Sequence, residues 1–228
     1  MDFLPVFLNI KGRPCVVVGG GAVAARKAAL LHAAGADVTA IPLKLAPGLA
    51  GWVQGQKIKY RSESFHAAAL EGAVLVLAAT DDAAVNRRVY EAANARGIPV
   101  NVADNPNLSS FIMPSIVDRS PLIVAVSTGG ASPVLARFLR ARLEAFIPAS
   151  YGRLAKLVGQ FRDAVKRRLT HPLQRRRFWE DVLSGPIAEQ VHTGEERAAH
   201  TALQKKLDAA PDGAPTGMVY LVGGGPGD

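Results

Sequence analysis

The feature that most constrains this chain is a valine run that breaks into three glycines and resumes as an alanine-rich segment, over residues 16–27. β-Branched residues favour strands and alanine favours helices, so this stretch predicts a strand, a tight turn and a helix. Gly19, Gly21 and Ala24 fit the spacing G-x-G-x-x-G/A. In that pattern the first glycine permits the turn, the second lets backbone approach a pyrophosphate, and the third position packs helix on strand. We interpret the stretch as a dinucleotide-binding turn, although similar turns also occur where nothing binds.

The composition of the chain limits the classes of protein to which it can belong. The chain has 228 residues, of which 49% are hydrophobic, enough for a substantial core. Neither a membrane-length apolar run nor a secretory leader is present in the sequence, so we expect a cytoplasmic protein with no membrane partner. Cys15 is the only cysteine, which excludes an internal disulfide or a thiolate cluster. Its place in the first predicted strand favours a small buried hydrophobe.

Positive charge is concentrated in one region. The formal net charge is +8, and residues 137–177 hold twelve Lys and Arg against only Glu144 and Asp163. This indicates a polyanionic partner, either nucleic acid or a small molecule with many carboxylates. The alternative is a solvated helix face.

Alternating strands and helices predict an α/β fold, a Rossmann-like doubly wound parallel sheet. The strands are predicted at residues 14–18, 37–41, 73–79 and 98–103, and the helices at 22–34 and 83–96. Between these lie a short helix at 47–54, a strand at 57–60 and a helical turn at 67–70.

A second unit is expected after residue 110, with strands at 111–117 and 121–126. The loop at 127–132 leads into a helix at 134–146, for which Ser132 is the cap and Pro133 the first residue. Two or three further helices should follow, up to about Leu207. A lone strand pair exposes both edges, which predicts a homodimer.

Ligands of open α/β sheets bind beyond the carboxyl ends of the strands. No acidic residue follows the second strand, where one would bind the ribose hydroxyls of the cofactor. Either backbone groups and Lys44 hold the ribose, or Lys44 favours a 2′-phosphate. The choice between NAD and NADP therefore stays open. The segment Thr80-Asp81-Asp82 either contacts the cofactor, or Asp81 and Asp82 cap the next helix. Asp104 lies where a nicotinamide would meet a substrate, or it is simply a turn residue.

Two further features of the sequence are a glycine-rich loop and the histidines. The glycine-rich loop at 127–132 is an anion nest at a helix N-terminus or a flexible turn. The five histidines show no i, i+4 pair, so we expect no permanent metal site built by the protein.

Several segments together closely resemble the N-terminal module of bifunctional and trifunctional siroheme synthases. The resemblance spans nearly the whole chain. It is carried by residues 4–7, 18–24, 78–82 with 85–86, 101–104, 110–115, 118–122 and 132–137. The chain departs from the family pattern at Ala22, where Asp is frequent, and at Thr128, where Ser is common.

The resemblance implies two activities: NAD-dependent oxidation of precorrin-2 to sirohydrochlorin, and insertion of ferrous iron, a substrate here, to give siroheme. A tetrapyrrole with eight carboxylates would explain the basic region without nucleic acid. Asp104 is implied as the catalytic residue of both reactions. The predicted cofactor-binding residues are Gly19, Gly21, Ala22, Val23, Pro42, Leu43, Lys44, Thr80, Asn101 and Val102. The predicted substrate-binding residues are Met113, Arg119, Ser127, Thr128, Gly129 and Gly130.

The resemblance also implies a division of the chain. We expect an NAD-binding Rossmann domain at 1–113, a small α+β dimerisation region at 114–147, a helical tetrapyrrole-binding region at 148–207 and a linker at 208–217. Residues 218–228 resemble the first strand and glycine loop of a fused uroporphyrinogen-III methyltransferase domain, so this chain should lack methyltransferase activity. The rival interpretations are a relative with dehydrogenase activity alone, an oxidoreductase for another acidic substrate, and a nucleotide-sensing or nucleic-acid-binding Rossmann protein.

Overall fold

A computed structural model describes residues 2–42 and 46–211 of the chain. The chain divides into two compact units. Unit 1 comprises Met1–Ser115 and Ser127–Ala136, and unit 2 comprises Ile116–Val126 and Arg137–Asp228. The predicted strand and glycine loop at 218–228 lie outside the described residues.

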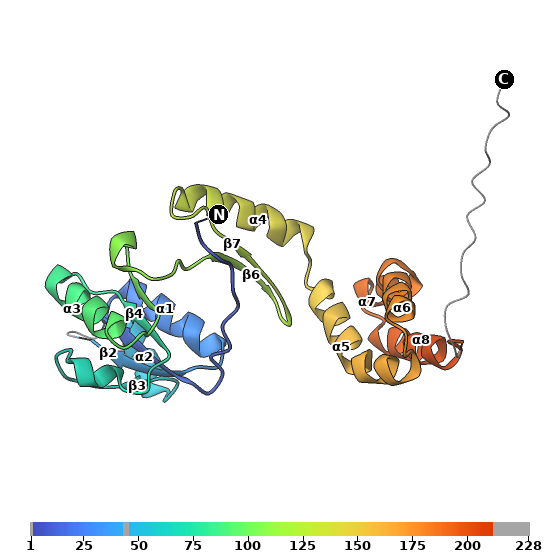
Figure 1. Ribbon diagram of the computed structural model, residues 1–228, viewed down its shortest axis with the longest axis horizontal. Helices are drawn as coiled ribbons and strands as arrows, with labels where there is room; N and C mark the ends of the chain where they lie inside the picture. The colour runs from blue at the N-terminus through green and yellow to red at the C-terminus, as the bar shows by residue number, and fades with distance from the viewer. Residues whose placement is uncertain (1, 43–45, 212–228) are drawn as a thin grey trace, which may run out of the picture. The chain divides into compact units, whose positions relative to one another are not determined.

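Unit 1 is built on a five-stranded sheet (Figure 1). Its strands are β1 (Pro14–Val18), β2 (Asp37–Ile41), β3 (Lys59–Tyr60), β4 (Leu75–Ala78) and β5 (Val100–Val102). All neighbouring strands are parallel, in the order β3-β2-β1-β4-β5. The chain leaves β1 toward one edge and later returns to build the other edge. The strand order therefore reverses between β1 and β4, and the prediction of a doubly wound sheet is confirmed.

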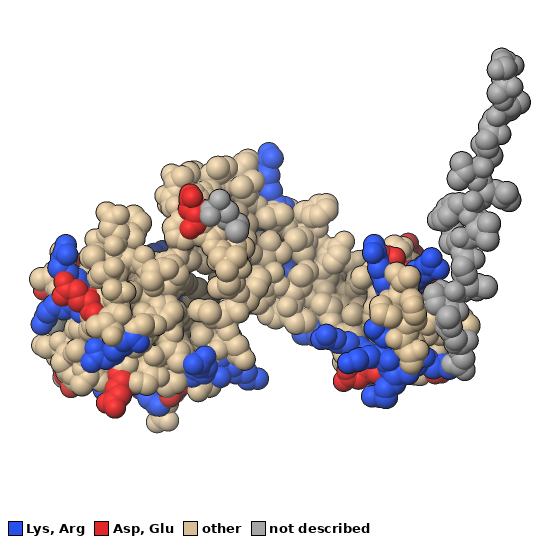
Figure 2. Space-filling model, viewed as in Figure 1, with Lys and Arg blue, Asp and Glu red and all other residues tan. Residues whose placement is uncertain are grey.

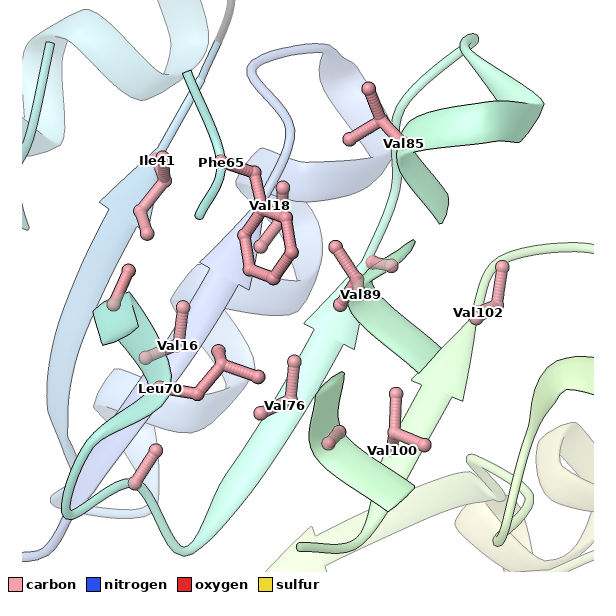
Figure 3. Close-up of a cluster of buried hydrophobic side chains, with 14 residues drawn as sticks. Val16, Val18, Ile41, Phe65, Leu70, Val76, Val85, Val89, Val100 and Val102 are labelled. Atoms are coloured by element: carbon pink, nitrogen blue, oxygen red, sulfur yellow. The ribbon is translucent and has the colours of Figure 1, made fainter. Parts of the chain in front are cut away.

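Helices cover both faces of this sheet. They are α1 (Ala22–Ala33), α2 (Pro47–Gln54) and α3 (Ala83–Asn94), with short 3₁₀ turns η1 (Ala67–Leu70) and η2 (Pro106–Leu108). Side chains alternate across each strand, so one face packs on α1 and α2 through Val17 and Leu77, both fully buried. The other face packs on α3 and η1. Figure 3 shows this second cluster, with Val16, Val18, Ile41, Phe65, Leu70, Val76, Val85, Val89, Val100 and Val102 labelled.

A two-stranded sheet follows, formed by β6 (Ser115–Arg119) and β7 (Leu122–Val126). The first of these strands begins four residues later than the expected residue 111. The reason is that Phe111 and Met113 pack against the core on the α1 side of unit 1. Helix α4 (Pro133–Phe146) then starts at the predicted proline.

Unit 2 contains a helical core of its own. The helices are α5 (Ser150–Arg168), α6 (Pro172–Ser184), α7 (Pro186–His192) and α8 (Glu196–Asp208). They bury Phe161, Val182 and Leu203 in one cluster. The expectation of two or three helices was therefore wrong, because the described residues 150–208 form four. Gly185 ends α6 and Pro186 begins α7 without any intervening loop, a Gly-Pro boundary that the sequence-based prediction overlooked. None of the helices in the described ranges is long and apolar enough to cross a membrane.

Candidate nucleotide and substrate site

The glycine turn lies at the carboxyl edge of the sheet in unit 1, directly after β1. Gly19 has φ +132°, and a Cβ at this position would overlap the carbonyl oxygen of Ala79, which follows β4. The Gly19 amide donates to the Ile41 carbonyl at 3.0 Å. Gly19 is therefore required because three strand ends converge there, a packing reason that the sequence motif did not reveal.

Gly21 differs from Gly19 in its backbone conformation and in the space around it. Its φ is −79°, and a Cβ would meet no heavy atom of the described residues within 4 Å. It is the N-cap of α1, and no side chain caps that helix. The first N–H groups of α1, which include those of Ala22 and Val23, have no partner within the helix and can receive an anion. The cradle fits the pyrophosphate of a nicotinamide dinucleotide.

The segment after β2 is described only in part. Pro42 is buried directly after the strand. The Ala46 amide donates to the Gly20 carbonyl at 3.0 Å, so the chain returns to the glycine turn at this point. Leu43 and Lys44 lie outside the described residues, and their roles toward the ribose stay predictions.

The end of β4 is organised by local hydrogen bonds. The Asp82 carboxylate accepts from the amides of Ala84 and Val85, so it caps α3, and the capping alternative is confirmed. The Thr80 hydroxyl lies 2.9 Å from Asn86 Oδ1, and the Asn86 amide donates back to the Thr80 carbonyl at 2.9 Å. Asn86, which our sequence reasoning did not place in the site, fixes the position of Thr80.

Asp104 follows β5 and adopts φ +57°, a left-handed conformation that few non-glycine residues adopt. Such conformations persist only where the surrounding structure holds them, and they concentrate at functional sites. The exposed Asp104 side chain borders a hollow of about 410 Å³. The hollow is also lined by residues at the start of α3 and after β5, among them Ala83, Asn86, Arg87, Val102 and Leu108.

Asn101 and Val102, both predicted to contact the cofactor, play different structural parts. Val102 packs its side chain into the core on the α3 side, and its amide donates to Ser109 Oγ at 2.9 Å. Asn101 points to the opposite face. Its Oδ1 accepts from Lys27 Nζ at 2.8 Å, and its Nδ2 donates to the Phe111 carbonyl at 3.0 Å.

Lys27 was missed in the sequence, although a lysine among the alanines of α1 was a visible signal. The side chain is half-buried. Burial lowers the pKa of its ammonium, whereas the nearby Asp104 carboxylate acts in the opposite direction and Arg26 adds to the lowering. The structure thus brings a cation from α1 into the field of Asp104.

The loop after β7 is closed by its own hydrogen bonds. Thr128 Oγ1 bonds the amide and the carbonyl of Ser132 at 3.0 and 3.1 Å, and Ser127 Oγ accepts from the Gly129 amide at 3.2 Å. Gly129 and Gly130 both have positive φ, at 66° and 87°. Ser132 also caps α4, as predicted, by accepting from Leu135. Anion binding by this loop, like substrate contact by the half-buried Met113, stays a prediction.

Arg119 belongs to unit 2, where its side chain forms hydrogen bonds at the C-terminal end of α4. Its guanidinium donates to the carbonyls of Ile147 and Glu144 at 2.9 and 3.2 Å and pairs with the Glu144 carboxylate at 3.6 Å. These bonds satisfy carbonyls that a helix end leaves unpaired. Figure 2 shows many Lys and Arg side chains over α5–α8. Within the described ranges, no three His, Cys, Asp or Glu side chains cluster as metal ligands would.

Comparisons with known proteins match both units. The NAD(P)-binding family profile covers residues 6–115, the sirohaem biosynthesis protein central profile covers 119–145, and the sirohaem synthase dimerisation profile covers 150–207. Unit 1 therefore carries a Rossmann-type domain that binds a nicotinamide nucleotide, and the chain continues into a region of sirohaem synthase type.

Curated relatives define the family further. The siroheme synthases of Nitrosospira multiformis and Methylobacillus flagellatus are 57% and 56% identical over 100% of this chain and 49% of theirs. That of Chromobacterium violaceum is 51% identical over 100% of this chain and 48% of its own. The chain is homologous over its whole length to the N-terminal half of these siroheme synthases and spans about half of their length. The solved structure of SirC, a precorrin-2 dehydrogenase, shares the fold, with a TM-score of 0.68 at 22% identity over 89% of this chain and 100% of that one.

Proposed function

We propose that this chain oxidises precorrin-2 to sirohydrochlorin with NAD as the hydride acceptor. One observation carries the proposal. Asp104, held in a left-handed conformation, shares the carboxyl edge of the sheet with the open cradle at Gly21, in a chain homologous to the N-terminal half of siroheme synthases. A proton acceptor and a site for a hydride acceptor thus occur on one edge.

The roles of the residues follow from this arrangement. Bound NAD would supply the hydride acceptor for a C–H bond of the substrate, and the electron pair of that bond would leave with the hydride. Asp104 accepts the proton that must leave at the same time. The backbone of Gly19, Gly21, Ala22 and Val23 holds the pyrophosphate, and residues 42–44 hold the ribose. Thr80, Asn101 and Val102 border the nicotinamide end.

The substrate proposed is a tetrapyrrole with eight carboxylates. Its negative charge matches the basic segment at 137–177. The Ser127–Gly130 loop contributes amide donors next to two positive-φ glycines, with Met113 and Arg119 as further contacts. A homodimer completes the proposal, and the dimerisation profile supports the dimer. That profile covers residues 150–207, which the predicted division gave to tetrapyrrole binding, and does not cover the predicted dimerisation region at 114–147. A monomeric mass in solution would contradict the dimer.

We also propose that the chain inserts ferrous iron into sirohydrochlorin. Two pyrrole N–H protons leave as Fe²⁺ enters. Asp104 takes one at a time and passes it to water, so a resident metal ligand is unnecessary. Gly21→Asp tests the separation of the two reactions, because it places a side chain and a negative charge in the pyrophosphate cradle. Oxidation should be lost and iron insertion kept. Failure of wild-type protein to insert iron would leave a dehydrogenase alone.

The central experiment is incubation of the protein with precorrin-2 and NAD while NADH is followed by absorbance. Wild-type protein should accumulate NADH, and Asp104→Asn should reduce both activities by about 100-fold or more while NAD affinity stays unchanged. If the cofactor binds and no NADH forms, the dehydrogenase proposal fails. Salt-sensitive binding of DNA without binding of tetrapyrrole would instead favour a nucleic-acid-binding protein.

A further inference from the structure

The hollow beside Asp104 is bordered by a cation and an amide to which the proposed mechanism gives no role. The hollow measures about 410 Å³ and lies between the start of α3 and the segment that follows β5. Its cation is Arg87 on α3, and its amide is Asn105, which directly follows Asp104. Two donor side chains from different elements therefore border the same hollow as the proposed proton acceptor.

Both donors are available to a ligand. In the described part of the chain the guanidinium of Arg87 makes no hydrogen bond and no ion pair, even with Glu91 one turn further along α3. The side-chain amide of Asn105 makes no hydrogen bond there either. Asn86 also lines the hollow, but its amide is bonded to Thr80 at 2.9 Å.

Helix α3 presents Arg87 at the hollow. Burial of Val85 in the core fixes the rotation of the helix. Residues three or four positions apart share a helix face, and helical side chains lean toward the N-terminus of their helix. Ala83 and Ala84 precede Arg87 by four and three positions, and both line the hollow. Their small side chains leave room there for the guanidinium and for a ligand.

The size and lining of the hollow limit what it can receive. Pockets that enclose a drug-sized molecule measure ~300–1,000 Å³. A hollow of about 410 Å³ is therefore too small to enclose a tetrapyrrole with eight carboxylates, but it can receive one edge of the molecule. Ala83, Ala84 and Leu108 offer apolar contacts to a ring. A guanidinium matches a carboxylate through two parallel N–H···O bonds.

We propose that Arg87 is a specificity-determining residue, which binds one peripheral carboxylate of the tetrapyrrole in this hollow with the Asn105 amide as a second donor. The inference rests on the proposed function, from which it takes the substrate. A carboxylate at the edge of the substrate is not altered by the oxidation. Arg87 therefore contributes equally to substrate binding and to the transition state, so it lowers KM and leaves kcat unchanged.

Steady-state oxidation of precorrin-2 tests this role. Arg87→Met keeps a long side chain and removes its charge, so KM for precorrin-2 should rise about tenfold while kcat stays within about twofold of wild type. Arg87→Lys keeps the charge but loses the paired N–H groups, and its KM should lie between these values. Arg88→Met is the matched control, because Arg88 is exposed on α3 and does not line the hollow. Its KM and kcat should equal those of wild type.

Titration with sirohydrochlorin, followed by absorbance, gives a second readout that needs no turnover. The dissociation constant should rise about tenfold in Arg87→Met, because the product keeps the same peripheral carboxylates. Asn105→Ala should raise it about threefold, since a hydrogen bond from a neutral amide is weaker. Arg88→Met should bind sirohydrochlorin as wild type does. The dissociation constant for NAD and the melting temperature of Arg87→Met should stay at wild-type values.

Three results would overturn the inference. The first is a wild-type KM for precorrin-2 and a wild-type affinity for sirohydrochlorin in Arg87→Met. The second is an equal loss in Arg88→Met, which would indicate a general effect of charge. The third is weaker NAD binding by Arg87→Met, which would place the cofactor in the hollow. The proposed function fails separately, when wild-type protein forms no NADH, and the sirohydrochlorin titration then still tests Arg87.

Discussion

The two glycines of the nucleotide turn should respond to alanine in opposite ways. Gly19→Ala places a methyl group against the Ala79 carbonyl at φ +132°. A conformation available almost only to glycine costs about 1–3 kcal/mol, and forced overlap with a rigid backbone atom costs a similar amount. We therefore expect a loss of about 4 kcal/mol in the free energy of unfolding, and a melting temperature lowered by roughly 10 °C.

Gly21→Ala should leave stability almost unchanged. Its φ of −79° suits any residue, and within the part of the chain that the structure describes no atom lies within 4 Å of the new methyl group. Alanine is a poorer N-cap than glycine, which lowers stability, but it makes the unfolded chain less flexible, which raises stability. These two effects nearly cancel, so the free energy of unfolding should change by about 1 kcal/mol or less. The methyl group fills the cradle, so affinity for NAD should fall roughly tenfold or more.

Thermal melting followed by circular dichroism and fluorescence titration with NAD measure the two effects on the same samples. The reasoning is refuted if Gly19→Ala melts at the wild-type temperature. It is equally refuted if Gly21→Ala binds NAD with wild-type affinity, because the open space above Gly21 would then not be the cradle.

Two further predictions concern the elements around the site. Asp82→Ala removes the cap of α3 and should lower the unfolding free energy by about 1 kcal/mol in a urea titration, whereas Asp82→Asn, which still accepts the helix amides, should lose less. Burial raises the pKa of the Cys15 thiol from 9.0 to about 11, so the folded state keeps a proton that the unfolded chain releases. Stability should therefore fall as pH rises from 9 to 11, and a Cys15→Val variant that kept the same slope would contradict this account.

The sequence was sufficient for those parts of the fold that depend on local pattern. Strands β1, β2 and β4, the glycine turn and the start of α4 at Pro133 all lie where propensity, periodicity and capping place them. The helices of unit 2 were undercounted, although Gly185 and Pro186 form a Gly-Pro dipeptide, which is a sequence signal for a break between two helices.

The site was harder to predict because its decisive contacts join distant residues. Asp104 was identifiable from its place after a strand, but its left-handed backbone was not. Lys27 and Asn101 are 74 positions apart, and no local rule pairs them. Similarly, the need for glycine at residue 19 comes from Ala79, which arrives only when β4 packs beside β1.

The path of the chain between the two units has a practical consequence for dissecting the molecule. Residues 116–126 are grouped with unit 2, and residues 127–136 return to unit 1 before the chain leaves it again. Ending an expressed fragment at Ser115 would therefore discard ten residues of unit 1, including the loop at Ser127–Gly130. A fragment that keeps all of unit 1 would instead join Ser115 to Ser127 by a short artificial linker in place of residues 116–126. Unit 1 is therefore a discontinuous domain, and no single N-terminal stretch of the chain contains all of it.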